Sequence, residues 1–96
     1  MATLQSKLHI PESVYFQLVT DEAVILDTAS GKYFGLDDVG TRMWQLLTEH
    51  GQIEPAYQAL LQEYEVGAER LKADLLGLVD QLAAKGLILV DEYPAE

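Results

Sequence analysis

A change in the spacing of apolar residues near Leu36 constrains the fold more than any other feature of this chain. From Val14 to Leu36 the apolar residues form short runs rich in β-branched and aromatic types, "VYFQLV", "AVILD" and "YFGL", separated by turn residues. Beyond Leu36 they recur at helical spacing. This order predicts a three-stranded antiparallel meander, with a tight turn at Ser30–Gly31, followed by helices.

Three helices are expected after the strands, over about residues 37–51, 55–67 and 68–85. Asp37 can cap the first, Pro55 suits the first turn of the second, and Gly86 stands where a left-handed residue ends the third. The run "LILV" then indicates a short final strand. The predicted fold is α+β, with the content of a winged helix-turn-helix domain and its sheet placed first.

The length of 96 residues predicts a single domain, 1–96, with its core over about 14–90 and mobile polar ends at 1–6 and 91–96. There is no cysteine, no apolar run of membrane-spanning length and no signal-peptide pattern, so we expect a cytoplasmic protein without a membrane partner. A net charge of −10, from 16 acidic and 6 basic residues, argues against a nucleic-acid partner.

The sequence offers no nucleophile with a base and no metal-ligand spacing, so we expect no catalytic residue, no metal and no cofactor. Each candidate for such chemistry has a simpler structural or surface role. His9 lies in a strand-like segment and His50 at a helix end, and Asp37–Asp38 cap a helix. The glutamates form a solvated face, namely Glu63, Glu65 and Glu69. The glycines serve turns or close backbone contacts, namely Gly31, Gly35 and Gly40.

Apolar residues cover an unusually wide arc of the third helix. At 100° per residue one cluster points toward the sheet, namely Leu71, Leu75, Leu78 and Leu82. A second cluster, Leu76, Val79 and Ala83, is bordered by Lys72 and Asp80. It either lines a groove or is covered by the first two helices. The strand "KYFGL" can supply the other side of such a groove, because one edge of a meander has unpaired backbone groups to which an extended peptide can add as a strand.

The stretch "VILDTASGKYFGLDDVGTRMWQLL", continued by "ALLQEYEV" and "LKADLLGLVDQLAAKGLI", closely resembles the PqqD-like proteins, the recognition elements of ribosomally made, post-translationally modified peptides (RiPPs). The resemblance is greatest to the free-standing form of lasso-peptide pathways. It implies a non-catalytic module that binds the leader of a precursor peptide as an antiparallel strand and presents it to a separate leader peptidase. By position, the edge would be Lys32, Tyr33, Phe34, Gly35 and Leu36, and the opposing wall Lys72, Leu75, Leu76, Val79, Leu82 and Ala83.

Strand parity divides the predicted edge, since Phe34 and Leu36 share one face and Tyr33 and Gly35 the other. Phe34 and Leu36 are expected in the core, which leaves Tyr33 to contact a ligand or simply to cover the outer face of the sheet. Two other functions remain as alternatives, a winged-helix transcription regulator, which the element order fits, and a non-catalytic subunit that completes a partner enzyme. The acidic second and third helices argue against a DNA-recognition helix.

Overall fold

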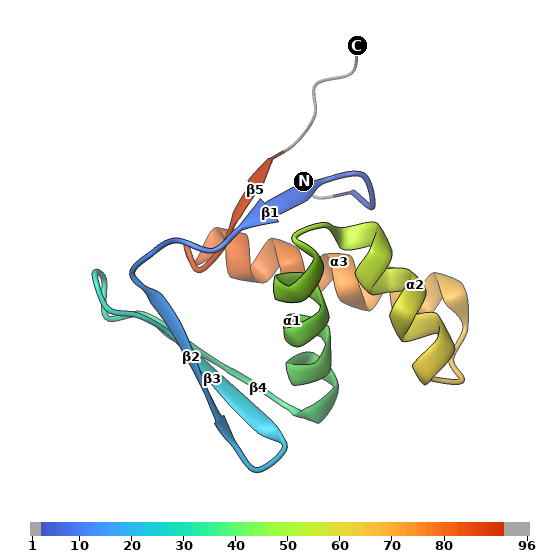
Figure 1. Cartoon of the computed structure of the whole chain (residues 1–96), viewed down its shortest axis with the longest axis horizontal. Helices are drawn as coiled ribbons and strands as arrows, with labels where there is room; N and C mark the ends of the chain where they lie inside the picture. Colours follow the sequence, from blue (N-terminus) through green and yellow to red (C-terminus); the bar gives the residue numbers. More distant parts are fainter. Residues whose placement is uncertain (1–2, 92–96) are drawn as a thin grey trace.

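The structure, a computed structural model, describes residues 3–91. Its elements are β1 (Lys7–His9), β2 (Val14–Val19), β3 (Glu22–Asp27), β4 (Tyr33–Leu36), α1 (Asp38–His50), α2 (Ile53–Glu63), α3 (Ala68–Ala84) and β5 (Leu89–Asp91). Strands β2, β3 and β4 form one antiparallel sheet, and β1 pairs with β5 in a second (Figure 1). The predicted α+β fold, a three-stranded antiparallel sheet followed by three helices, is confirmed, and the small second sheet is an addition.

The inner face of the sheet β2–β4 packs on the helices. Burial alternates along β3, where Ala23 and Ile25 are buried and Val24 is exposed. Across the strands Ile25 lies opposite Phe16 and Phe34. The ring of Phe16 meets the ring of Trp44 in α1 edge-on, with 6.1 Å between ring centres. This contact places α1 against the inner face.

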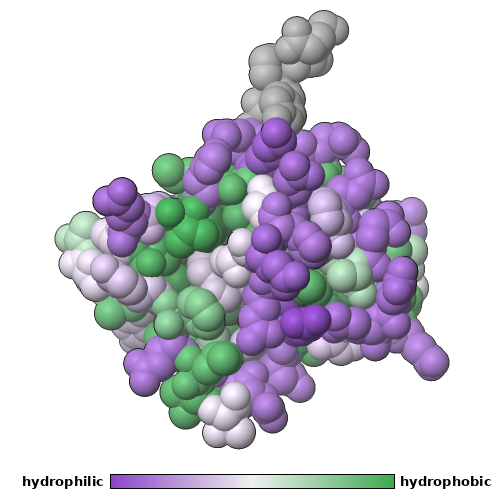
Figure 2. All heavy atoms as spheres, viewed as in Figure 1, coloured by the Kyte–Doolittle hydropathy of each residue, from purple (hydrophilic) through white to green (hydrophobic). Residues whose placement is uncertain are grey.

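The outer face of the same sheet has an apolar row that runs across all three strands. Tyr15, Leu26 and Tyr33 are paired neighbours in register, and all three are exposed. In the view of Figure 2, hydrophobic residues gather on the side where the sheet lies, whereas mostly hydrophilic residues lie over α1 and α2. The outer face of the sheet therefore exposes more apolar side chains than the surface over α1 and α2 does.

The boundaries of α1 and α3 follow the sequence signals closely, whereas α2 begins two residues before Pro55 and ends at Glu63, four residues before the predicted end at Gly67. The Asp37 carboxylate accepts a hydrogen bond from the Gly40 N–H at 2.8 Å and so caps α1. Gly51 and Gly86, which end α1 and α3, have φ of 68° and 75°, in the left-handed region that disfavours a residue with a Cβ. Pro55 lies in the first turn of α2.

Strand β1 pairs with β5, so residues from opposite ends of the sequence lie side by side. Lys7 lies opposite Asp91, and the side chain of Leu8 is buried. Ser6 is also buried. Of the ends expected to be mobile, residues 1, 2 and 92–96 lie outside the described residues, while residues 3–6 form a turn before β1 and Asp91 ends β5.

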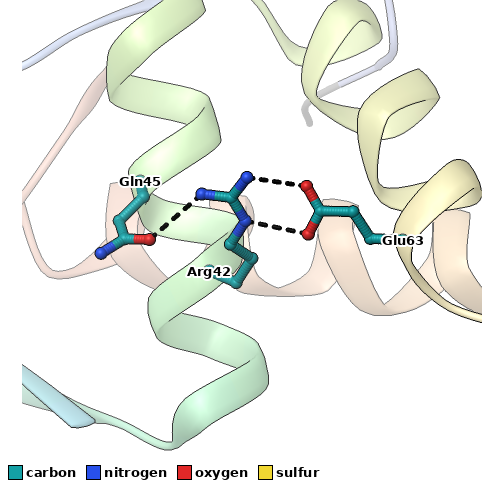
Figure 3. A network of polar contacts seen from close by, with 3 residues as sticks. All are labelled: Arg42, Gln45 and Glu63. Carbon is teal, nitrogen blue, oxygen red and sulfur yellow. Dashed lines mark hydrogen bonds and ion pairs between the residues drawn. The ribbon is translucent and has the colours of Figure 1, made fainter. Parts of the chain in front are cut away.

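An ion pair joins α1 to α2 on the molecular surface (Figure 3). The Arg42 guanidinium donates to both carboxylate oxygens of Glu63, at 2.9 and 2.7 Å, and to the side-chain oxygen of Gln45 at 3.3 Å. The hydrogen bond from Arg42 holds the pKa of the Glu63 carboxyl below its usual value. Of the described helices, α3 is the longest, and none is both long and apolar enough to cross a membrane.

Candidate functional site

Strand β4 lies at an edge of its sheet. Its hydrogen-bonded neighbour within the described residues is β3. The Asp27 N–H donates to the Lys32 carbonyl at 2.9 Å, and in an antiparallel ladder such pairs alternate with non-bonded ones. Phe34 therefore bonds to β3, and the N–H and C=O groups of Tyr33 and Gly35 point to the open edge. These four groups are a template for an added strand.

Two cavities lie between this open edge and α3. The first has a volume of about 660 Å³ and is lined by Gly31, Lys32, Tyr33, Phe34, Gln81, Ala84 and Lys85. The second has about 470 Å³ and is lined by Phe34, Gly35, Leu36, Asp37, Val39, Gly40, Met43, Asp74 and Leu78. They share Phe34, so together they form one furrow, which we call the β4–α3 groove. All five residues predicted for the edge, Lys32 to Leu36, line it.

The residues predicted for the wall on α3 lie outside the flank of the helix that lines the β4–α3 groove. Leu75, Val79 and Leu82 are completely buried in the core, and none of the six predicted wall residues lines either cavity. Lys72, Leu76 and Ala83 are only partly exposed, on the flank turned away from β4. Leu78, which the sequence places in the core, is only partly buried against it and lines the groove.

The physical reason is a small rotation of the helix. The sequence places the buried centre of α3 near Leu71, Leu75, Leu78 and Leu82, but the structure buries Val79 in place of Leu78. With Val79 in the buried face of α3, the flank on the other side of that face lies next to β4. That flank consists of Asp74, Leu78, Gln81 and Lys85, which follow one another at intervals of three or four residues.

The groove is apolar along its floor and charged at its two ends. Leu36 and Met43 are buried there, and Phe34 is half-buried beneath Lys85, whose Nζ lies 5.9 Å from the centre of the phenyl ring. Asp37 and Asp74 stand at the opposite end, where Asp37 caps α1 and Asp74 lies 3.7 Å from Arg70. Apolar contacts with a few polar groups around them are typical of peptide-binding grooves.

The two faces of β4 are divided as strand parity predicted. Leu36 is buried and Phe34 packs against the core, which confirms the inward assignment. Tyr33 is 69% exposed on the outer face. Gly35 has no atom within 4 Å of the position that a Cβ would take, so the outer face of the sheet is open beside β4.

The histidines and carboxylates considered above as catalytic or metal-ligating candidates lie apart from the groove or have structural partners. The Nε2 atom of His9 lies 2.6 Å from the Asp91 carboxylate, where β1 pairs with β5, and His50 is in the last turn of α1. Glu63 pairs with Arg42. Within residues 3–91, histidines and carboxylates nowhere gather in a group of three that could hold a metal ion.

Comparisons with known proteins show what this chain is similar to in sequence and fold. The family model described as coenzyme PQQ synthesis protein D (PqqD) matches residues 22–88. A solved structure, "TbiB1 in Complex with the TbiA(beta) Leader Peptide", is 36% identical, with a TM-score of 0.77 over 90% of this chain and 98% of its own. Another, "Lasso peptide synthetase B1 complexed with the leader peptide", is 26% identical, with a TM-score of 0.77 over 86% and 98% of the two chains. No curated protein matches significantly.

Proposed function

Because the chain belongs to the PqqD family, we propose that it is a non-catalytic recognition element of lasso-peptide biosynthesis, which binds the leader segment of a ribosomally made precursor peptide. The observation that supports this most directly is the open edge of β4 beside an apolar groove, in a chain 36% identical to a protein solved with a leader peptide. The leader adds to β4 as an antiparallel strand. Its backbone bonds to Tyr33 and Gly35, and its side chains enter the β4–α3 groove.

We further propose that the bound precursor is presented to a separate leader peptidase, in the cytoplasm where the precursor is made. A module that holds both partners converts their encounter into an intramolecular one and so raises their effective concentration. This work needs no chemistry from the module itself.

Binding is tested with leader peptides that lack their core region. Fluorescently labelled leaders encoded beside this gene are titrated with the purified chain, and duplex DNA is titrated in parallel. We expect a leader to bind in the nanomolar to micromolar range and DNA not to bind, because the chain has a net charge of −10. If every neighbouring leader fails to bind, the proposal is wrong; tight DNA binding would favour a transcription regulator.

Strand addition is tested at Gly35. Its N–H points to the open edge, so Gly35→Pro removes a bond to the leader without removing one to β3, and proline is tolerated on edge strands. Gly35→Ala is the control, because it keeps the N–H and its Cβ meets no atom within 4 Å. We expect the alanine variant to bind normally and the proline variant to bind at least about tenfold more weakly while keeping its circular dichroism spectrum. Equal binding by both variants would exclude strand addition at β4.

The proposed lack of catalytic activity is tested separately. Precursor incubated with this protein alone is expected to keep its mass, measured by mass spectrometry. A mass change caused by rigorously purified protein would require an enzyme.

A further inference from the structure

The two ends of the β4–α3 groove differ in charge. Lys32 and Lys85 line the cavity at the Tyr33 end, whereas none of the acidic residues does so. The cavity at the Leu36 end has the reverse composition, with Asp37 and Asp74 and no basic residue. In a chain with 16 acidic and only 6 basic residues, a cavity with two lysines and no carboxylate departs from the rest of the surface.

The two lysines lack the carboxylate partners that arginines elsewhere have. Arg42 pairs with Glu63 and Arg70 with Asp74, but within residues 3–91 neither Lys32 nor Lys85 lies within ion-pair distance of a carboxylate. The contact that Lys85 does make is with the face of the Phe34 ring, on the floor of the groove. Both ammonium groups therefore remain available to an anionic side chain in the groove.

The direction of the bound strand assigns these lysines to one part of the peptide. β4 runs from Tyr33 to Leu36, so an antiparallel peptide passes Leu36 first and Tyr33 later. The C-terminal part of the bound segment then lies beside Lys32 and Lys85. Its N-terminal part lies over Val39, Met43 and Leu78, beside the carboxylates of Asp37 and Asp74.

We infer that the groove selects peptides by charge order, favouring an acidic side chain in the C-terminal part of the bound segment and disfavouring one in the N-terminal part. This inference rests on the proposed leader binding and adds a specificity rule to it. Opposite charge at one end and like charge at the other fix both the register and the direction of the strand. The lysine pair also offsets locally the repulsion between an acidic peptide and a chain of net charge −10.

The rule is tested with a displayed library of short random peptides, selected on the wild-type chain and on the double variant Lys32→Gln/Lys85→Gln. Lys7→Gln in β1 is the control, because it removes one positive charge by the same substitution at a residue that does not line the groove. Peptides selected by the wild type and by the control should be enriched in Asp and Glu toward their C-terminal ends. The double variant should lose this enrichment while still selecting apolar peptides.

A cycle of titrations then separates a charge contact from a structural role of Lys85. A selected peptide and its Glu→Gln counterpart are each titrated against wild type and Lys85→Gln at low and high salt. We expect a loss of about 2- to 5-fold for one lysine and about tenfold for both, seen with the Glu peptide, absent with the Gln peptide and reduced by salt. Equal losses for both peptides would mean that Lys85 only supports the groove, and would overturn the rule.

The possible failures are distinguishable. If neither a selected peptide nor any leader encoded beside this gene binds in titration, the proposed function itself is wrong. If peptides bind but show no acidic enrichment, or show it at their N-terminal ends, peptide binding stands and the charge rule is wrong.

Discussion

The rotation of α3 is best tested by placing the same charge at two adjacent positions, Val79 and Leu78. Val79 has no exposed surface, whereas Leu78 is half-buried and lines the β4–α3 groove. We expect Val79→Asp to unfold the protein. Leu78→Asp should leave it folded and weaken leader binding.

The magnitudes follow from these two environments. At Val79 the substitution loses about 1.5–3 kcal/mol of apolar burial and leaves an unpaired carboxylate in the core, for a total above about 5 kcal/mol. That is comparable to the whole stability of a domain of this size, about 5–15 kcal/mol. At Leu78 the carboxylate keeps access to water, so the cost is about 1–2 kcal/mol, including a few tenths from repulsion by Asp74 one turn away. The free energy of leader binding should fall by about 2 kcal/mol, because the groove has to desolvate the charge.

Thermal unfolding followed by circular dichroism and leader titration by fluorescence anisotropy measure the two effects. Leu78→Asp should lower Tm by about 4–16 °C and weaken binding more than about tenfold, while Val79→Asp should show no cooperative transition. Leu78→Ala is the control for lost volume, since it shortens the side chain without adding charge. The reasoning is refuted if Val79→Asp folds and Leu78→Asp does not, because α3 would then present the opposite flank to β4.

Three further predictions concern stability and ionisation. Thr41→Val should be neutral or stabilising by up to about 1 kcal/mol in chemical denaturation, because the buried Thr41 hydroxyl has no hydrogen-bond partner among residues 3–91; a clear loss would reveal one. Hydrogen bonds from Ser13 and Ser30 lower the pKa of the Asp27 carboxyl, so by NMR it should titrate below 3.8. The stability that this carboxylate contributes is then fully present above 3.8 and lost as pH falls through the lower folded-state pKa, and Asp27→Asn should remove that part of the acid sensitivity. Gly51→Ala should cost about 1 kcal/mol, read from the unfolding midpoint, since φ there is 68°; an unchanged midpoint would contradict the assigned cap.

The parts of the fold that the sequence predicts are those with local causes. Runs rich in β-branched and aromatic residues mark β2 to β4, and Asp37 and Gly86 mark helix ends through contacts within a few residues. The pairing of β1 with β5 was not predicted, because three-residue strands have no readable alternation and their partners lie at opposite ends of the sequence.

In the candidate site, too, the sequence predicts correctly only the features that have a local cause. Parity along β4 correctly separated Tyr33 from Phe34, since neighbouring strand residues point to opposite faces. On α3, Leu78 and Val79 are adjacent and both apolar, so periodicity alone does not decide which one is buried. The buried face follows from packing against α2 and within the shared core, which becomes visible only when the elements are assembled.

The pairing of β1 with β5 has a consequence for how such a module can be joined to other proteins. Because Lys7 and Asp91 lie across from each other, both ends of the described chain emerge at one place. No residue of either strand lines the β4–α3 groove. A fusion partner or an immobilising tag would therefore occupy the same position whether attached before β1 or after β5, and the peptide edge would stay open in either arrangement. The same adjacency makes the domain a candidate for circular permutation, with a short linker across this pair and new ends opened in the hairpin at Thr20–Asp21.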